Sequence, residues 1–153
     1  MVLTQNRDGE QALADLTFGI ESAPWRESAP CVQLSRRESQ KNAMSKRFFS
    51  DNLDERNYAI LLCSRCPVQA ECLTFALSTE ARVSAGTPLY GIFGGFVASK
   101  RRDALRSLTV RQLVEHLMRR SQYDTIRSRL QALLRDYDTN VLDSVLINAT
   151  KQS

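Results

Sequence analysis

The 153-residue sequence contains a single histidine, His116. Sites that need several imidazoles are therefore excluded, and a Ser-His-Asp or Cys-His arrangement would have to use that one residue. The length is that of one globular domain, with room for at most an appendage, so a large multidomain enzyme is excluded as well. What the sequence does contain is four cysteines.

Long apolar runs are also lacking. Spanning a bilayer takes roughly 18 to 20 apolar residues, whereas the densest run here covers only residues 59–63. The first 20 residues carry four charged side chains, so nothing in them resembles a secretory signal. We therefore expect a cytoplasmic protein with no membrane partner. In that reducing compartment the cysteines are metal ligands or redox thiols rather than a disulfide framework.

The formal net charge is +4, and the excess of positive charge is local. Residues 99–135 hold 10 basic and 3 acidic side chains, while residues 1–98 hold 10 basic and 11 acidic ones. A polyanionic partner is therefore plausible for the C-terminal third of the chain.

Apolar residues recur at helical spacing along most of the chain. The pattern predicts a helix from Asn52 to Cys66, and Pro67 stops it and can begin a second helix. Glycine and proline break residues 82–95, and residues 97–149 return to helical periodicity. No run alternates over strand length, so the predicted fold class is mainly α. Residues 1–24 are polar and read as a flexible N-terminal segment, with one short helix as the alternative.

The cysteine spacing is Cys31-x31-Cys63-x2-Cys66-x5-Cys72. Cys63 and Cys66 lie one helical turn apart, and the break at Pro67 allows Cys72 to fold back toward them. Structural zinc usually uses two close Cys/His pairs. A pair with a third and a distant fourth cysteine suits an iron–sulfur cluster better. Zinc and ordinary buried or redox cysteines remain open on spacing alone.

Further residues make this pattern more specific. They are Trp25-Arg26 ahead of Cys31, Phe48-Phe49, Cys63-x2-Cys66-Pro67-Val68-x3-Cys72-Leu73, and Gly91-Ile92-Phe93-Gly94-Gly95 before a basic segment. Together they resemble the WhiB-like family of actinobacteria and their phages, over about residues 25 to 106.

The resemblance implies a transcription regulator, not an enzyme. It implies a [4Fe-4S] cluster on Cys31, Cys63, Cys66 and Cys72 that responds to nitric oxide or to redox conditions. It also implies binding to the C-terminal domain of the primary sigma factor of RNA polymerase and to double-stranded DNA.

The resemblance suggests a sigma-facing surface and a DNA-contacting segment. The sigma-facing residues would be Trp25, Phe48, Phe49, Gly91, Phe93, Gly94 and Gly95. The DNA-contacting residues would be Lys100, Arg101, Arg102 and Arg106. Taken without the resemblance, the aromatic residues could be core, the glycines could only shape a turn, and the basic residues could be a solvated helix face.

Three departures from the family pattern are visible. The Cys31 to Cys63 spacer is longer through a basic insertion, Ser50 stands where proline is usual, and Phe93 stands where the family has tryptophan. Since Phe93 lacks an indole donor, we expect sigma binding to be weaker or retuned.

The predicted organisation is a flexible segment at 1–24, a cluster domain at 25–98 and a basic helical region at 99–153. In the last, residues 124–130 resemble the second helix of a helix-turn-helix. Thr125, Arg127, Ser128 and Arg129 would face the groove, and Ile126, Leu130 and Leu133 would pack inward. The alternative is that these helices bury one another or cap the cluster domain.

Two other functions remain open. The metal-free protein could act as a disulfide reductase through Cys63 and Cys66, although no βαβ pattern surrounds that pair. A zinc-bound form could serve as a sigma-binding inhibitor module.

Overall fold

The structure is a computed structural model that describes residues 2–83 and 86–151. Over these residues the chain is helical, without a β-strand, so the mainly α prediction is confirmed. The elements are α1 (Val2–Glu21), the 3-10 helix η1 (Pro24–Ser28), α2 (Pro30–Ser35), α3 (Lys41–Phe49), α4 (Leu53–Ser64), α5 (Gln69–Glu80), α6 (Ala98–Ser107), α7 (Val110–Arg120), α8 (Asp124–Asp136) and α9 (Thr139–Lys151).

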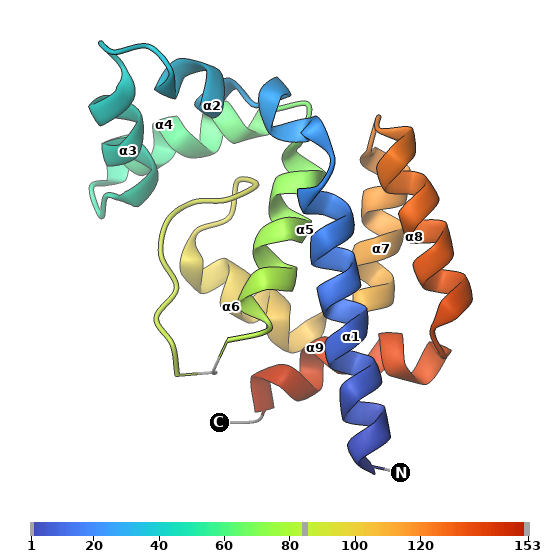
Figure 1. The fold of residues 1–153 in the computed structure, drawn as a ribbon. Helices are drawn as coiled ribbons and strands as arrows, with labels where there is room; N and C mark the ends of the chain where they lie inside the picture. The colour runs from blue at the N-terminus through green and yellow to red at the C-terminus, as the bar shows by residue number, and fades with distance from the viewer. Residues whose placement is uncertain (1, 84–85, 152–153) are drawn as a thin grey trace.

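Helix α5 lies between two groups of helices (Figure 1). On one side α1, α7, α8 and α9 pack together and against α5, forming the larger part of the core. On the other side lie α2, α3 and α4, with the segment that joins α5 to α6 running between them and α5 (Figure 1). The cysteines belong to this second group or to the facing part of α5.

The N-terminal segment corrects one expectation. Residues 2–21 form a 20-residue helix rather than a flexible segment. Its buried face includes Ala12, Leu13, Leu16 and Ile20, which recur at helical spacing, and it packs against α5, α8 and α9. The polar sequence concealed this helix because its stability comes from partners that are distant in the chain.

The C-terminal region begins with a well-defined helix start. Thr109 and Gln112 form a capping box at α7, with reciprocal hydrogen bonds of 3.1 and 2.9 Å. The prediction that Ile126, Leu130 and Leu133 face inward is confirmed, since all three are buried.

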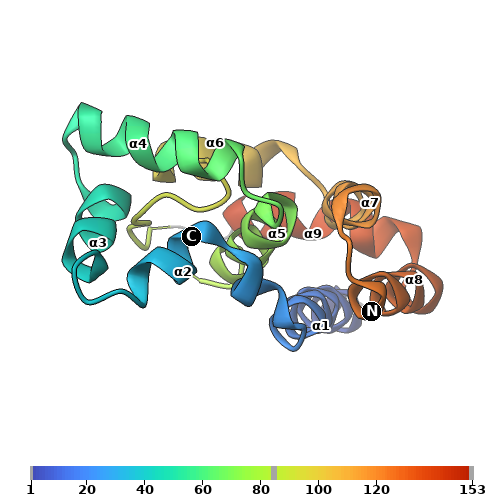
Figure 2. The same ribbon diagram turned by 90° about the horizontal axis from the view of Figure 1, so that it is seen from above.

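Helices α7 and α8 form an antiparallel hairpin. They run side by side in Figure 1, and both are seen end-on in Figure 2. A helix-turn-helix places its second helix in the major groove of DNA, and that interpretation of α8 stays a prediction. The groove-facing residues also have other neighbours: Arg127 pairs with Asp124, and Arg129 lies over the Phe18 ring. Helices α7 and α8 also contact each other, and α7 contacts α5, as the alternative expects.

Helices α4 and α5 meet at a sharp bend. Asn52 caps α4 by accepting a hydrogen bond from the Glu55 amide. The helix ends at Ser64, α5 begins at Gln69, and the two axes differ by 116°. In the described chain no single helix is long and apolar enough to cross a membrane, and only this bent pair taken together meets that test.

Candidate metal centre

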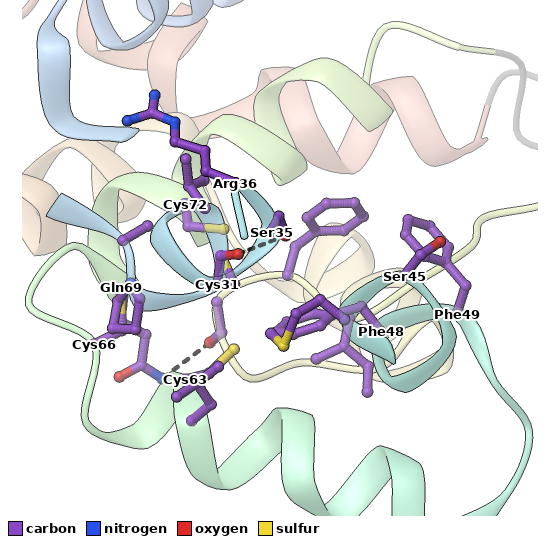
Figure 3. A pocket seen from close by; sticks show the side chains of 18 of the residues that line it. Cys31, Ser35, Arg36, Ser45, Phe48, Phe49, Cys63, Cys66, Gln69 and Cys72 are labelled. Atoms are coloured by element: carbon purple, nitrogen blue, oxygen red, sulfur yellow. Dashed lines mark hydrogen bonds between the residues drawn. The ribbon is translucent and has the colours of Figure 1, made fainter. Parts of the chain in front are cut away.

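The four cysteines line one cavity of about 490 Å³. Cys31 lies on α2, Cys63 at the end of α4, Cys66 in the α4–α5 connection and Cys72 on α5. None of them forms a disulfide. The close view shows the four side chains gathered at one end of the cavity (Figure 3). The sequence prediction that Cys72 folds back toward the Cys63–Cys66 pair is therefore confirmed.

The α4–α5 bend explains this arrangement. The Cys66 amide donates to the Cys63 carbonyl at 3.0 Å, so both residues lie in one tight turn at the helix end. Pro67 follows and cannot continue the helix hydrogen bonding. After the bend, the first turn of α5 carries Cys72, whose amide donates to the Val68 carbonyl at 3.0 Å.

The other end of the cavity is apolar. Phe48 and Phe49 lie across the cavity from the cysteines (Figure 3). Two basic side chains from the insertion between Cys31 and Cys63, Arg36 and Lys41, also line the cavity. The non-cysteine lining is Ala29, Pro30, Val32, Ser35, Arg36, Lys41, Met44, Ser45, Phe48, Phe49, Leu62, Gln69, Ile92, Phe93 and Gly94.

Burial raises the pKa of all four thiols. The pKa of Cys63 rises to about 11 and that of Cys72 to about 12. Backbone hydrogen bonds act in the opposite direction and favour the thiolate. The one at Gly95 acts on Cys63, and the one at Gly94 acts on Cys72. Burial outweighs these contributions, so without a metal the thiols are protonated at neutral pH. A metal would have to displace those protons.

Four thiols on one cavity are a donor set that both structural zinc and an iron–sulfur cluster use. In the described residues, no group of three His, Cys, Asp or Glu side chains is arranged to hold a single metal ion.

A glycine turn closes the cavity beside Cys63 and Cys72. Gly91, Gly94 and Gly95 all have positive φ, at 76, 59 and 83°. A Cβ atom on Gly95 would lie 3.5 Å from the Cβ of Cys63. The Gln69 side chain holds the turn by donating to the Gly94 carbonyl at 2.9 Å, a bond drawn in Figure 3.

The predicted aromatic surface is only partly exposed. Phe49 is 59% exposed and meets Phe93 edge-on, with ring centroids 6.2 Å apart. Phe48 is half-buried beneath them. Trp25 does not fit the prediction, because it is 3% exposed and its indole donates to the Ile20 carbonyl at 2.7 Å. Its role is to join η1 to the end of α1.

The predicted DNA-contacting residues also separate into two groups. Lys100, Arg102 and Arg106 are exposed on α6. Arg101 is fully buried and pairs with Glu80 at 2.8 Å, so it does not fit the predicted DNA contact. On a helix, adjacent residues point about 100° apart, and Arg101 lies on the same face of α6 as Leu105, four residues later, which is also buried.

Sequence reasoning missed three polar residues at this site: Gln69, Glu80 and Glu71. Glu71 is fully buried, and neither carboxylate oxygen has a hydrogen-bond partner. Burial raises the pKa of this carboxyl to about 7. The only sequence signal was a glutamate directly before Cys72, on a helix with few charges.

The family model of the transcription factor WhiB matches residues 25–104. The matched range begins at Trp25, contains all four cysteines and the glycine turn, and ends within α6. The chain belongs to the WhiB family of transcription factors. Helix α1 and helices α7 to α9 lie outside the matched range of this WhiB-family chain. Searches of curated proteins and of solved structures found no match.

Proposed function

We propose that this WhiB-family protein is a cytoplasmic iron–sulfur transcription regulator. Cys31, Cys63, Cys66 and Cys72 hold a [4Fe-4S] cluster. An aromatic surface at the glycine turn binds the C-terminal domain of the primary sigma factor, and α6 contacts double-stranded DNA. The observation that carries the proposal is the convergence of four cysteine side chains, one buried and three half-buried, on one cavity beside that turn, in a chain of this family.

The residues present fit a cluster. Four thiols are the usual ligand set of a [4Fe-4S] centre, and all four face one cavity of about 490 Å³. The cysteine pattern, a close pair with a third and a distant fourth cysteine, suits a cluster better than structural zinc, which usually uses two close pairs. The backbone of Gly94 and Gly95 favours the thiolate form of Cys72 and Cys63, as a thiolate-ligated group requires.

When bound, the cluster would supply reactivity toward nitric oxide or oxygen. The chain itself orients four thiolates, limits their contact with water and holds the glycine turn against two of them. The cluster would hold α2, the α4–α5 connection and α5 together through its cysteine ligands. Loss of the cluster would remove that link. We infer that partner binding then changes, since the aromatic surface is built on the adjoining segments.

The sigma-facing surface is made by Phe49 and Phe93, with Phe48 supporting them. The three glycines give the turn its shape, and Gly91 leaves room for the Phe49 ring: a Cβ atom there would lie 2.6 Å from Phe49 Cε1. Buried Trp25 acts indirectly. Phe49 is exposed at the end of α3, and the half-buried Phe93 meets it from the turn. Aromatic side chains of this kind are the type of anchor that dominates protein interfaces.

The DNA-facing residues are Lys100, Arg102 and Arg106, exposed on α6 directly after the turn. Arg106 has a weak exposed partner in Asp103, at 3.8 Å, which leaves its charge available to phosphates. Contacts of this kind give affinity that depends strongly on salt and little on sequence.

The thiol chemistry favours metal binding over disulfide reduction. A nucleophilic Cys-x2-Cys thiol normally has a lowered pKa, whereas burial raises the pKa of both Cys63 and Cys66. The proposed protein is accordingly a regulator and not an enzyme.

The function is tested by binding measurements on the full chain purified without oxygen. Binding to the sigma C-terminal domain and to duplex DNA is compared before and after the cluster is removed with nitric oxide or a chelator. The proposal predicts that at least one affinity changes by about tenfold or more, which corresponds to about 1.4 kcal/mol. Equal affinities of both forms for both partners would contradict it.

A further inference from the structure

Arg101 has the most complete set of hydrogen bonds in the site, although it touches none of the cysteines. Its Nε and Nη2 donate to the two oxygens of Glu80 at 2.8 and 2.9 Å. Its Nη2 also donates to the Tyr90 carbonyl at 2.7 Å, and its Nη1 donates at 2.7 Å to the carbonyls of Gly91 and Phe96. One guanidinium therefore joins the end of α5 to both ends of the glycine turn.

Burying this pair has an energetic cost. Taking two charges out of water is expensive, and apolar residues of similar volume often stabilise a core as well or better. Arg101 is fully buried, and the Glu80 side chain is only 15% exposed. What an apolar pair could not do is bind three backbone carbonyls in fixed directions, which a planar guanidinium does with its fork of N–H groups. The pair is thus suited to fixing the geometry of the turn.

The opposite side of the same turn meets the cysteines. Gly95 lies against Cys63, as the 3.5 Å separation between an added Cβ and the Cys63 Cβ shows. Gly94 lies against the backbone of Leu73, the residue after Cys72. The turn therefore has Arg101 bound to its carbonyls on one side and two thiols next to its glycines on the other.

Arg101 also contacts the aromatic surface. Its guanidinium carbon lies 5.0 Å from the centre of the Phe93 ring, within the range of a cation–π contact. Phe93 in turn packs against Phe49. The same side chain therefore touches the partner-facing ring and the backbone of the segment that adjoins the metal site.

We propose that Arg101, paired with Glu80, is a positioning residue that holds the Tyr90–Phe96 turn in register with Cys63 and Cys72 and couples the metal site to the Phe93 surface. The effect of Arg101 on a cluster rests on the proposed function. Its effect on the geometry of the turn does not. Hydrogen bonds to cluster sulfurs are one of the determinants of reduction potential. Hydrogen bonds from the turn stabilise the reduced cluster most, because it carries the more negative charge. If the turn moves away from the thiolates, these hydrogen bonds are lost and the reduction potential of the cluster should fall.

The test uses the full chain with Arg101→Lys and Glu80→Gln. Lysine keeps the charge but cannot reach Glu80 and three carbonyls with one planar group. Glutamine keeps the shape and removes the negative charge. Arg135→Lys on α8 is the control, since Arg135 is exposed and its partner is the adjacent Asp136. Circular dichroism establishes that each variant keeps its helices.

The first measurement is amide hydrogen exchange at Gly94 and Gly95 in the protein as purified. In both variants these amides should exchange at least about tenfold faster. Losing hydrogen bonds to a charged group shifts the equilibrium between the closed and the open turn by about that factor. Exchange in α8 should not change. Unchanged exchange at Gly94 and Gly95 in a folded variant would overturn the proposal. If Arg101→Lys does not fold, Glu80→Gln decides.

The second measurement is the midpoint potential of the cluster-loaded protein. It should shift to a more negative value in both variants and stay unchanged in Arg135→Lys. An unchanged potential would overturn the coupling to the metal site. The two proposals fail in different ways. If the wild-type chain binds no cluster, the proposed function fails and exchange still decides the positioning role. If the cluster forms and exchange is unaffected, only the positioning role fails.

Discussion

Gly94 lies directly against Leu73. A Cβ atom at Gly94 would be 2.5 Å from the Leu73 Cβ and 2.8 Å from its Cα, closer than real Cβ contacts come. The φ of Gly94 is also positive, at 59°. Because Leu73 follows Cys72 on α5, any movement that makes room for a side chain would displace a cysteine or the turn that covers it.

Replacing Gly94 with alanine should therefore damage both stability and the metal site. Gly86→Ala is the matched control, because no atom lies within 4 Å of a Cβ built there. We expect Gly94→Ala to cost roughly 1 to 3 kcal/mol of unfolding free energy, from strain and the clash, and to reduce iron content. Thermal unfolding and an iron assay of both variants check this. Equal behaviour of the two variants would contradict the packing described.

The aromatic residues should separate into a binding residue and a structural one. Phe49→Ala should weaken sigma-domain binding by about tenfold or more, because exposed aromatic anchors commonly contribute more than 1 kcal/mol, and should leave the melting temperature nearly unchanged. Trp25→Phe should leave binding unchanged and lower stability by about 1 kcal/mol, since it loses the hydrogen bond to Ile20. Calorimetric titration and thermal melts distinguish the two. The reverse pattern would mean that the surface is wrongly assigned.

The exposed cations of α6 should act on DNA binding through salt-dependent contacts. Lys100→Ala, Arg102→Ala and Arg106→Ala should each weaken binding to unrelated duplexes to a similar extent. Each should also reduce the slope of log affinity against log salt by about 1. Arg135→Ala, which removes the same charge from α8, is the control and should change neither quantity. An unaltered salt slope in the α6 variants would exclude that helix from the DNA interface.

The contact between Tyr137 and Asp15 tests how α1 docks. The Tyr137 hydroxyl donates to Asp15 Oδ2 at 2.6 Å. Burial, followed by this bond and the nearby carboxylates, raises the pKa of Tyr137 above its ordinary value of 10. A raised pKa in the folded state means that the stabilisation is complete below about pH 10 and is lost as the pH rises beyond it.

Tyr137→Phe should consequently lower stability by roughly 1 kcal/mol at pH 7. The difference from wild type should shrink above pH 10. Denaturant unfolding at pH 7 and above pH 10 measures both effects, with Tyr90→Phe as the control because Tyr90 is 69% exposed. A difference that stays constant with pH would show that the phenol does not depend on Asp15.

The bend that brings Cys72 back toward Cys63 and Cys66 was predictable because its signals are local. The Cys63–Cys66 spacing, Pro67 and the three glycines each dictate a nearby backbone shape, and the structure has those shapes. The helical character of residues 97–149 was also predictable, because buried positions such as Leu113 and Leu117 recur at helical spacing.

Other features depend on contacts between distant residues. Three examples are the docking of α1 on α5, the packing of Trp25 against Phe75 and the pairing of Arg101 with Glu80. Each joins segments that are far apart in the sequence, and periodicity does not identify such partners. Within the basic run, Arg101 faces inward while Lys100 and Arg102 face solvent. The helical spacing of Arg101 and Leu105 was a signal of this, but the partner Glu80 was not predictable from spacing.

The central claim is that the four cysteines hold an iron–sulfur cluster. The most direct test is an iron, sulfide and zinc assay with an absorption spectrum, on protein purified without oxygen and on its four Cys→Ser variants. The account predicts about four irons per chain and a broad visible band that nitric oxide bleaches. Serine at Cys31, Cys63, Cys66 or Cys72 should reduce both iron and sulfide. Stoichiometric zinc without visible absorbance would contradict the account.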